Sequence, residues 1–155
     1  MCLNKTHSNV RIAGKDIYTF KRLKSNLTAP YQYKFQYKLN FLYKTEIKHS
    51  RYDRKAILEG FHSLWATTLA YNEVSYFDRE KNIIVLCKIP KGSRYYIGKY
   101  SDIVSNQIII EKIIFEPKLI KPKQTRKGIK TWSSLTKQSE QYLKENYPNN
   151  IINAI

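Results

Sequence analysis

Six cations near the C-terminus form the strongest candidate for chemistry in this sequence. Residues 118–130 contain no acidic side chain and six basic ones: Lys118, Lys121, Lys123, Arg126, Lys127 and Lys130. Cations separated by polar residues can follow a phosphate backbone, and the adjoining Trp132 could stack on a base. The segment therefore predicts a nucleic-acid contact. The alternative for Trp132 is that it anchors a C-terminal helix to the rest of the fold.

A single histidine, His62, is a possible acid–base group. It lies between Phe61 and Ser63, at an expected junction between a strand and a helix. A histidine there could transfer protons near neutral pH, or it could fix the junction through a hydrogen bond. No second histidine or pair of carboxylates lies nearby in the sequence, and neighbouring side chains such as His62 and Ser63 rarely face each other. We therefore assign no catalytic residue and no cofactor, and expect a binding protein rather than an enzyme.

The other histidines and the cysteines give no metal-binding pattern. His7, His49 and His62 are far apart, and Cys2 and Cys87 are too few for a cysteine-rich zinc site. Because Cys87 lies in an apolar run, we expect it to be a small buried hydrophobic residue. Two such cysteines indicate a reducing compartment without a disulfide framework, which predicts a cytoplasmic protein.

The net positive charge of the chain indicates that its binding partners are negatively charged. Its 155 residues include 28 Lys and Arg against 12 Asp and Glu, which gives a net charge of +16. A positive surface of this kind favours nucleic acid, an anionic membrane surface or an acidic protein. AT-rich coding is the alternative source of the many lysines. The longest apolar runs are far shorter than the roughly 20 residues that a membrane span needs, so we expect no span.

Two segments in which apolar and polar residues alternate predict strands, and some of the lysines lie on these strands. Aromatic and apolar residues alternate with polar ones over residues 31–39, and the alternation resumes after Asn40 over residues 41–47. The spacing favours a hairpin or one long bent strand. Lys34, Lys38 and Lys44 lie on the polar side, where they would extend the basic surface across the sheet or form a solvated face.

The remaining pattern completes an α+β fold. We expect further strands over residues 16–24, 83–89, 94–98 and 107–115. We also expect two helices. The first covers residues 64–73 with Ser63 as its N-cap, and the second covers residues 134–146. The sequence thus predicts a twisted, mostly antiparallel sheet of five or six strands with one packed helix and a C-terminal helix. The expected divisions are a core domain (1–116) with a loose N-terminus, a basic linker (117–131) and a C-terminal helix and tail (132–155).

Five stretches of the chain resemble a family of small uncharacterised proteins from bacteria and their phages. They are residues 12–17, 30–43, 60–63, 89–96 and 105–110. Genes of this family often lie among phage and mobile-element genes. The resemblance therefore implies a counter-defence role in the cytoplasm of a bacterial host. An anti-CRISPR-like inhibitor that binds an effector complex and its guide RNA would fit that role.

A more distant likeness is to the ADP-ribosyltransferase fold. That fold has an early strand with a basic residue, a serine at a step from strand to helix, and a late strand with a glutamate. The corresponding residues here are Arg22, Ser63 and Glu111. Glu111 lies inside its strand rather than just before it, where Asp102 is the nearest acid. The likeness implies an NAD-dependent enzyme as the alternative function.

The sequence therefore predicts a basic, non-catalytic protein that binds RNA, DNA or a ribonucleoprotein. Its candidate contacts are the cations of residues 118–130, Trp132, Lys34, Lys38 and Lys44. Three alternatives stay open: the ADP-ribosyltransferase-like enzyme, an inhibitor of an acidic protein surface, and a structural or assembly protein.

Overall fold

The computed structural model describes residues 4–5, 9–29, 32–64, 82–98, 102–115, 141 and 145. These residues form thirteen strands in three sheets. In chain order the strands are β1 (Asn4–Lys5), β2 (Arg11–Ile12), β3 (Ile17–Lys24), β4 (Thr28–Ala29), β5 (Gln32–Gln36), β6 (Leu42–Lys44), β7 (Lys48–His49), β8 (Ala56–Glu59), β9 (Phe61–Leu64), β10 (Asn82–Ile89), β11 (Arg94–Ile97), β12 (Asp102–Ser105) and β13 (Gln107–Phe115).

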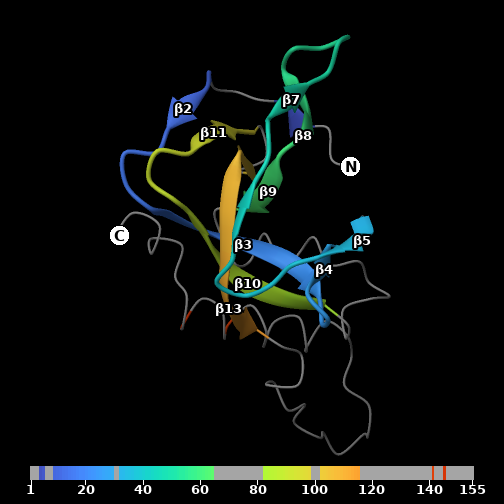
Figure 1. Cartoon of the computed structure of the whole chain (residues 1–155), viewed down its shortest axis with the longest axis vertical. Coiled ribbons are helices and arrows are strands. Elements are labelled where there is room, and N and C mark those ends of the chain that lie inside the picture. Colours follow the sequence, from blue (N-terminus) through green and yellow to red (C-terminus); the bar gives the residue numbers. More distant parts are fainter. Residues whose placement is uncertain are drawn as a thin grey trace, which may run out of the picture.

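An eight-stranded sheet forms the body of the described fold (Figure 1). Its strand order is β2-β11-β12-β9-β3-β10-β13-β6, and the pairs of neighbouring strands are antiparallel. β3 and β10 form its longest pairing, which runs from Ile17 opposite Ile89 to Lys24 opposite Asn82. Both strands are rich in the β-branched and aromatic residues that pack well on a pleated surface.

One face of this sheet packs around Tyr37. The buried cluster consists of Leu23, Tyr37, Ile83, Val85, Cys87, Ile108 and Ile110. Tyr37 follows β5, which pairs with β4, and its backbone N–H donates to the carbonyl of Leu27 at 3.0 Å. Burial raises the pKa of Tyr37, and it raises the pKa of the Cys87 thiol to about 12. The prediction that Cys87 is a buried hydrophobic residue is confirmed.

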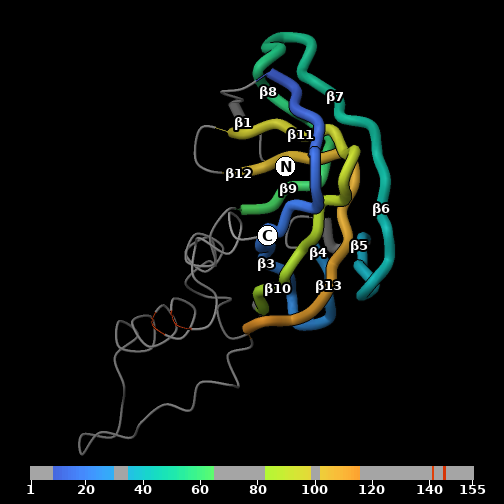
Figure 2. The backbone as a smooth tube through the Cα atoms, turned by 90° about the vertical axis from the view of Figure 1, so that its left-hand side faces the viewer, coloured from blue at the N-terminus to red at the C-terminus, as the bar shows by residue number. Residues whose placement is uncertain are grey.

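Strands β8 and β9 are separated only by Gly60 and belong to different sheets. β8 lies in a three-stranded sheet of order β1-β8-β7, whereas β9 lies inside the large sheet. The chain from β6 to β7 runs along one edge of the described fold, and the turn between β7 and β8 forms one end of it (Figure 2). Gly60 therefore connects this outer hairpin to the main sheet.

The prediction of an α+β fold with a packed helix is wrong. Strands hold 64% of the described residues, only 2% are helical, and the main sheet has eight strands instead of five or six. Ser63, the expected N-cap, lies within β9 opposite Ile103, and Leu64 ends that strand opposite Phe20 and Asp102. Pairing in a buried sheet outweighs the local capping preference here. Residues 65–73 lie outside the described part, as does the expected C-terminal helix apart from Gln141 and Glu145, which are helical.

The aromatic segments of residues 31–47 do not pair with each other as a hairpin. The chain turns at Asn40, whose φ is 55°, and β6 then adds to the outer side of β13. This arrangement places Tyr43 opposite Ile108, where it packs against the buried cluster. The predicted turn at Asn40 is confirmed. The partner of β6 is β13 rather than β5, because this pairing lets Tyr43 pack against the core.

Candidate nucleic-acid interface

Four aromatic rings form a connected patch beside β6. We call Phe35, Tyr37, Phe41 and Tyr43 the aromatic patch. The ring centroid of Tyr43 lies 5.5 Å from that of Phe35, 5.2 Å from that of Tyr37 and 4.8 Å from that of Phe41. The rings of Phe35 and Tyr37 are 4.8 Å apart with an interplanar angle of 77°, which is an edge-to-face contact. Tyr43 is therefore the centre of the patch.

The patch is buried at one end and open at the other. Tyr37 is only 5% exposed, whereas Phe35 and Phe41 are 36% and 52% exposed. The hydroxyl of Tyr43 accepts a hydrogen bond from the backbone N–H of Lys38 at 2.7 Å, which fixes the central ring. Anchored rings lose little entropy when a flat ligand stacks on them. Phe35 and Phe41 thus present aromatic surface to solvent beside an anchored ring.

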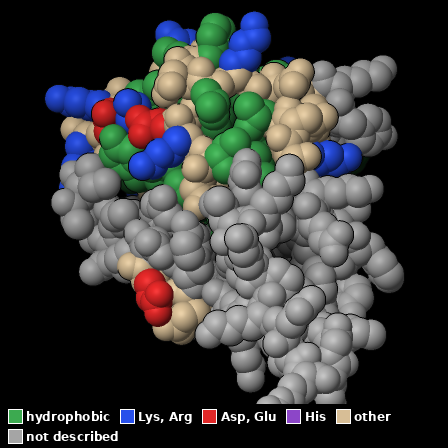
Figure 3. Space-filling model, turned by 90° about the horizontal axis from the view of Figure 1, so that it is seen from below, with side chains coloured by type: hydrophobic (Ala, Val, Ile, Leu, Met, Phe, Trp, Pro, Cys, Tyr) green, Lys and Arg blue, Asp and Glu red, His purple; other side chains and the backbone are tan. Residues whose placement is uncertain are grey.

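Lysines lie close to these rings in the chain or in space, although Lys44 points to the opposite face of the edge strand β6 from Tyr43. Lys38 and Lys44 are exposed, and the Lys21 ammonium lies 5.9 Å from the centre of the Tyr37 ring and donates to the carbonyl of His62 at 2.6 Å. Figure 3, which views the molecule from below, shows a group of hydrophobic side chains on the described surface with basic and acidic side chains at its margins. Aromatic faces next to cations are the combination that binds single-stranded nucleic acid.

The other predicted contacts lie largely outside the described part of the chain. Lys34 belongs to β5, but its side chain is not among those described. The same holds for Trp132 and the basic segment: Lys118, Lys121, Lys123, Arg126, Lys127 and Lys130. Sequence reasoning missed Phe35 and Phe41, because a period of two assigns every aromatic residue of such a strand to the core side. The signal was present in the surplus of aromatic residues over what one face can bury.

His62 lies in β9 opposite Val104, in surroundings that suppress its positive charge. Burial and the nearby positive charge of Lys21 lower the pKa of His62 to about 4. The imidazole is therefore neutral at physiological pH. Ser63, next to it, points to the opposite face of the strand, so the two side chains do not form a catalytic pair.

The three residues of the ADP-ribosyltransferase likeness do not converge. Phe20 lies opposite Leu64, so Arg22 shares the face of Leu64, while Ser63 points to the other face. Glu111 pairs with Lys88 at 2.9 Å and lies in β13 between the partners of Leu86 and Cys87, whereas Arg22 lies in β3, on the other side of β10, opposite Ile84. Asp102 is buried in β12 at the register of Leu64.

Comparison of this chain with family models, curated proteins and solved structures found no match. Within the described ranges, no group of His, Cys, Asp or Glu side chains is arranged to hold a metal ion. The same ranges contain no helix with the length and apolar character required to cross a membrane.

Proposed function

We propose that this protein binds single-stranded nucleic acid without catalysing a reaction. The aromatic patch would stack on bases, and Lys38 and Lys44 would contact the phosphates. The observation that carries the proposal is the half-exposed ring of Phe41, which joins a network that extends through Tyr43 to the buried Tyr37. Every base has a flat π face, so such a platform accepts many sequences.

Removing the stacking surface is the most direct test. Phe41→Ala should weaken binding of an oligonucleotide of about 16 nucleotides by about 5- to 150-fold, the range for loss of one base stack. Phe41→Tyr keeps an aromatic face and should bind like the parent. Fluorescence anisotropy with single-stranded RNA, single-stranded DNA and both duplexes would measure the affinities. Equal affinities for the Ala and Tyr variants would contradict the proposal.

The lysines are tested by the dependence of affinity on salt. Lys38→Gln combined with Lys44→Gln should reduce the slope of log affinity against log salt by about 1.4, which is 0.7 for each lost phosphate contact. Lys91→Gln combined with Lys112→Gln removes two exposed lysines outside the patch. This control pair should leave unchanged the part of the salt slope that comes from contacts at the patch. A slope that changes equally in both pairs would indicate diffuse attraction rather than a site.

The basic segment belongs to the same proposal. Its cations would add phosphate contacts, with Trp132 as a further stacking residue. Replacing Lys121, Lys123, Arg126 and Lys127 with Gln should lower the salt slope by about 3 if all four contact phosphates. The counter-defence role implied by the family resemblance stays a prediction, and co-purification with a host ribonucleoprotein would support it.

Binding to a protein is the second candidate. Leu39 and Leu42 are exposed beside the patch, and β6 is a short edge strand of the large sheet. Edge strands and apolar patches can dock a partner chain. A partner that remains bound after complete nuclease digestion, and that Leu42→Lys releases, would favour this candidate.

A further inference from the structure

The turn between β7 and β8 is a basic projection whose backbone is ordered by hydrogen bonds. Its sequence runs from Ser50 to Lys55 as Ser-Arg-Tyr-Asp-Arg-Lys. The backbone N–H of Ser50 donates to the carbonyl of Ala56, and that of Ala56 donates to the carbonyl of Asp53, both at 2.9 Å. The side chain of Asp53 accepts from the N–H of Lys55 at 2.9 Å. Asp and Ser commonly order turns in this way.

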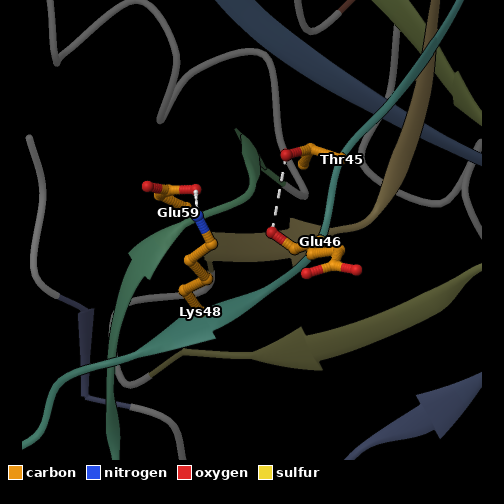
Figure 4. Close-up of polar contacts among 4 residues, drawn as sticks. All are labelled: Thr45, Glu46, Lys48 and Glu59. Atoms are coloured by element: carbon orange, nitrogen blue, oxygen red, sulfur yellow. Dashed lines mark hydrogen bonds and ion pairs between the residues drawn. The ribbon is translucent and has the colours of Figure 1, made fainter.

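Contacts on both sides of the hairpin hold this turn in place. The Nδ1 of His49 donates to the carbonyl of Arg54 at 2.8 Å, and the hydroxyl of Tyr96 in β11 lies 3.2 Å from its Nε2. At the base of the hairpin, Lys48 and Glu59 point toward each other from β7 and β8 with a separation of 3.0 Å (Figure 4). The turn is thus tied to the main sheet through His49.

The side chains at the tip are left facing solvent. Tyr52 is fully exposed, and Arg51, Arg54 and Lys55 are exposed around it. Within the described part of the chain, neither arginine forms an ion pair. Arg51 and Arg54 also line a surface hollow together with His49 and Ser50. An aromatic ring that packs against nothing, between unpaired guanidinium groups, contributes little to folding.

We propose that this tip is a second nucleic-acid contact, in which Arg51 and Arg54 hold a backbone phosphate and Tyr52 stacks on a base. The proposal rests on the function proposed above and extends it to a second site. Guanidinium groups bind phosphate through paired hydrogen bonds, and a tyrosine ring stacks on any base. Because the turn is already ordered, binding does not have to order it.

The same strand of nucleic acid can reach both sites. Arg51 of the tip lies seven positions after Lys44, which adjoins Tyr43 of the patch, so the backbones of Lys44 and Arg51 are at most about 25 Å apart. The connecting chain follows one edge of the fold (Figure 2). Sites that track a single strand span about 4–16 nucleotides, so a bound strand along this edge would contact the patch at one end and the tip at the other.

The experiment measures anisotropy of a single-stranded oligonucleotide of about 16 nucleotides with three tip variants. Tyr52→Ala should weaken binding by at least about fivefold, whereas Tyr52→Phe should bind like the parent because it keeps the stacking face. Arg51→Gln combined with Arg54→Gln should lower the salt slope by about 1.4. Lys91→Gln combined with Lys112→Gln is the control for charge alone. None of these substitutions removes a buried side chain, so melting temperatures should match the parent.

The outcomes separate this proposal from the one above. If the tip variants bind like the parent while Phe41→Ala is weakened, the tip proposal is wrong and the patch stands. Weakened tip variants with an unaffected Phe41→Ala would support the tip and contradict the patch. A parent that binds no oligonucleotide would overturn both. Displacement of the oligonucleotide by polyglutamate at equal charge concentration would assign the tip to an acidic polypeptide and overturn the nucleic-acid proposal.

Discussion

At the scale of single residues, the environment of His62 keeps the most conspicuous histidine of the chain in its neutral form. Its ring is largely buried in β9, and the Lys21 ammonium lies against its backbone carbonyl. Both features oppose a positive charge on the ring, which is why its pKa falls to about 4. A histidine with this pKa stays neutral over the physiological range and gains its positive charge only in acid. Its contribution is to the pH dependence of folding.

We expect the stability of the protein to fall as the pH drops from about 6.5 to about 4. The unfolded chain has the ordinary pKa of 6.5 at His62, so it binds more protons than the folded chain in this window. Lowering the pKa to about 4 corresponds to about 3 kcal/mol of folding free energy that is present above pH 6.5 and lost below it. Urea unfolding across this window should show a shallower pH dependence for His62→Gln. The same pH dependence of the free energy of unfolding in the parent and in His62→Gln would contradict the assignment of this effect to His62.

At the scale of elements, Gly60 sets how the outer hairpin joins the main sheet. Its φ is 153°, and a Cβ at this position would overlap the Cγ1 of Val104 in β12. Only glycine has room here, so the chain can pass from β8 into β9 against that strand. The orientation of the basic tip relative to the aromatic patch therefore depends on this residue.

We expect Gly60→Ala to lower the free energy of unfolding by about 1–3 kcal/mol, through overlap with Val104 and backbone strain. Gly14→Ala is the matched control, because a Cβ there would meet no atom within 4 Å. Urea denaturation of the two variants at pH 7 provides the comparison. Equal free energies of unfolding for the two variants would contradict this prediction, because they would mean that Val104 moves aside without destabilising the sheet.

At the scale of the whole molecule, the sheet separates residues that the ADP-ribosyltransferase likeness would unite. Ser63 and Arg22 occupy opposite faces, and Glu111 is engaged by Lys88. Exposed cations of the described residues lie along the edge that carries the patch and the tip, and also on other elements, among them Arg94 in β11 and Lys112 in β13.

We therefore expect NAD to leave the melting temperature unchanged. A ligand that binds only the folded state, and is present at a concentration many times its Kd, stabilises that state by several kcal/mol. Differential scanning fluorimetry detects a stabilisation of this size readily. A single-stranded oligonucleotide in the same assay serves as the positive comparison. A rise with NAD that Ser63→Ala or Glu111→Ala abolishes would restore the enzyme alternative.

Local pattern was sufficient for the long apolar strands, and it singled out two lysines of the candidate site. The predicted strands over residues 16–24, 83–89, 94–98 and 107–115 agree closely with β3, β10, β11 and β13. Their β-branched runs favour extended backbone whatever they pair with. Lys38 and Lys44 also stand out in the sequence and are exposed in the fold.

Other parts of the site needed the tertiary structure. Exposure of Phe35 and Phe41 depends on how β6 adds to β13, and the isolation of Tyr52 depends on pairing between β7 and β8. The segment of residues 50–55 has no periodicity, so its charges gave no local signal of a projecting tip. Ser63 carried a capping signal that sheet pairing overrode.

Composition and periodicity by themselves determined the positive charge, the extended backbone of the central strands and the burial of Cys87, since each of these follows from residues close together in the chain. Only the tertiary structure decided which aromatic rings face solvent, that Arg22 and Ser63 lie on opposite faces, and that one edge carries both the patch and the tip. Strand order and register arise from contacts between residues far apart in sequence, which local preferences do not specify.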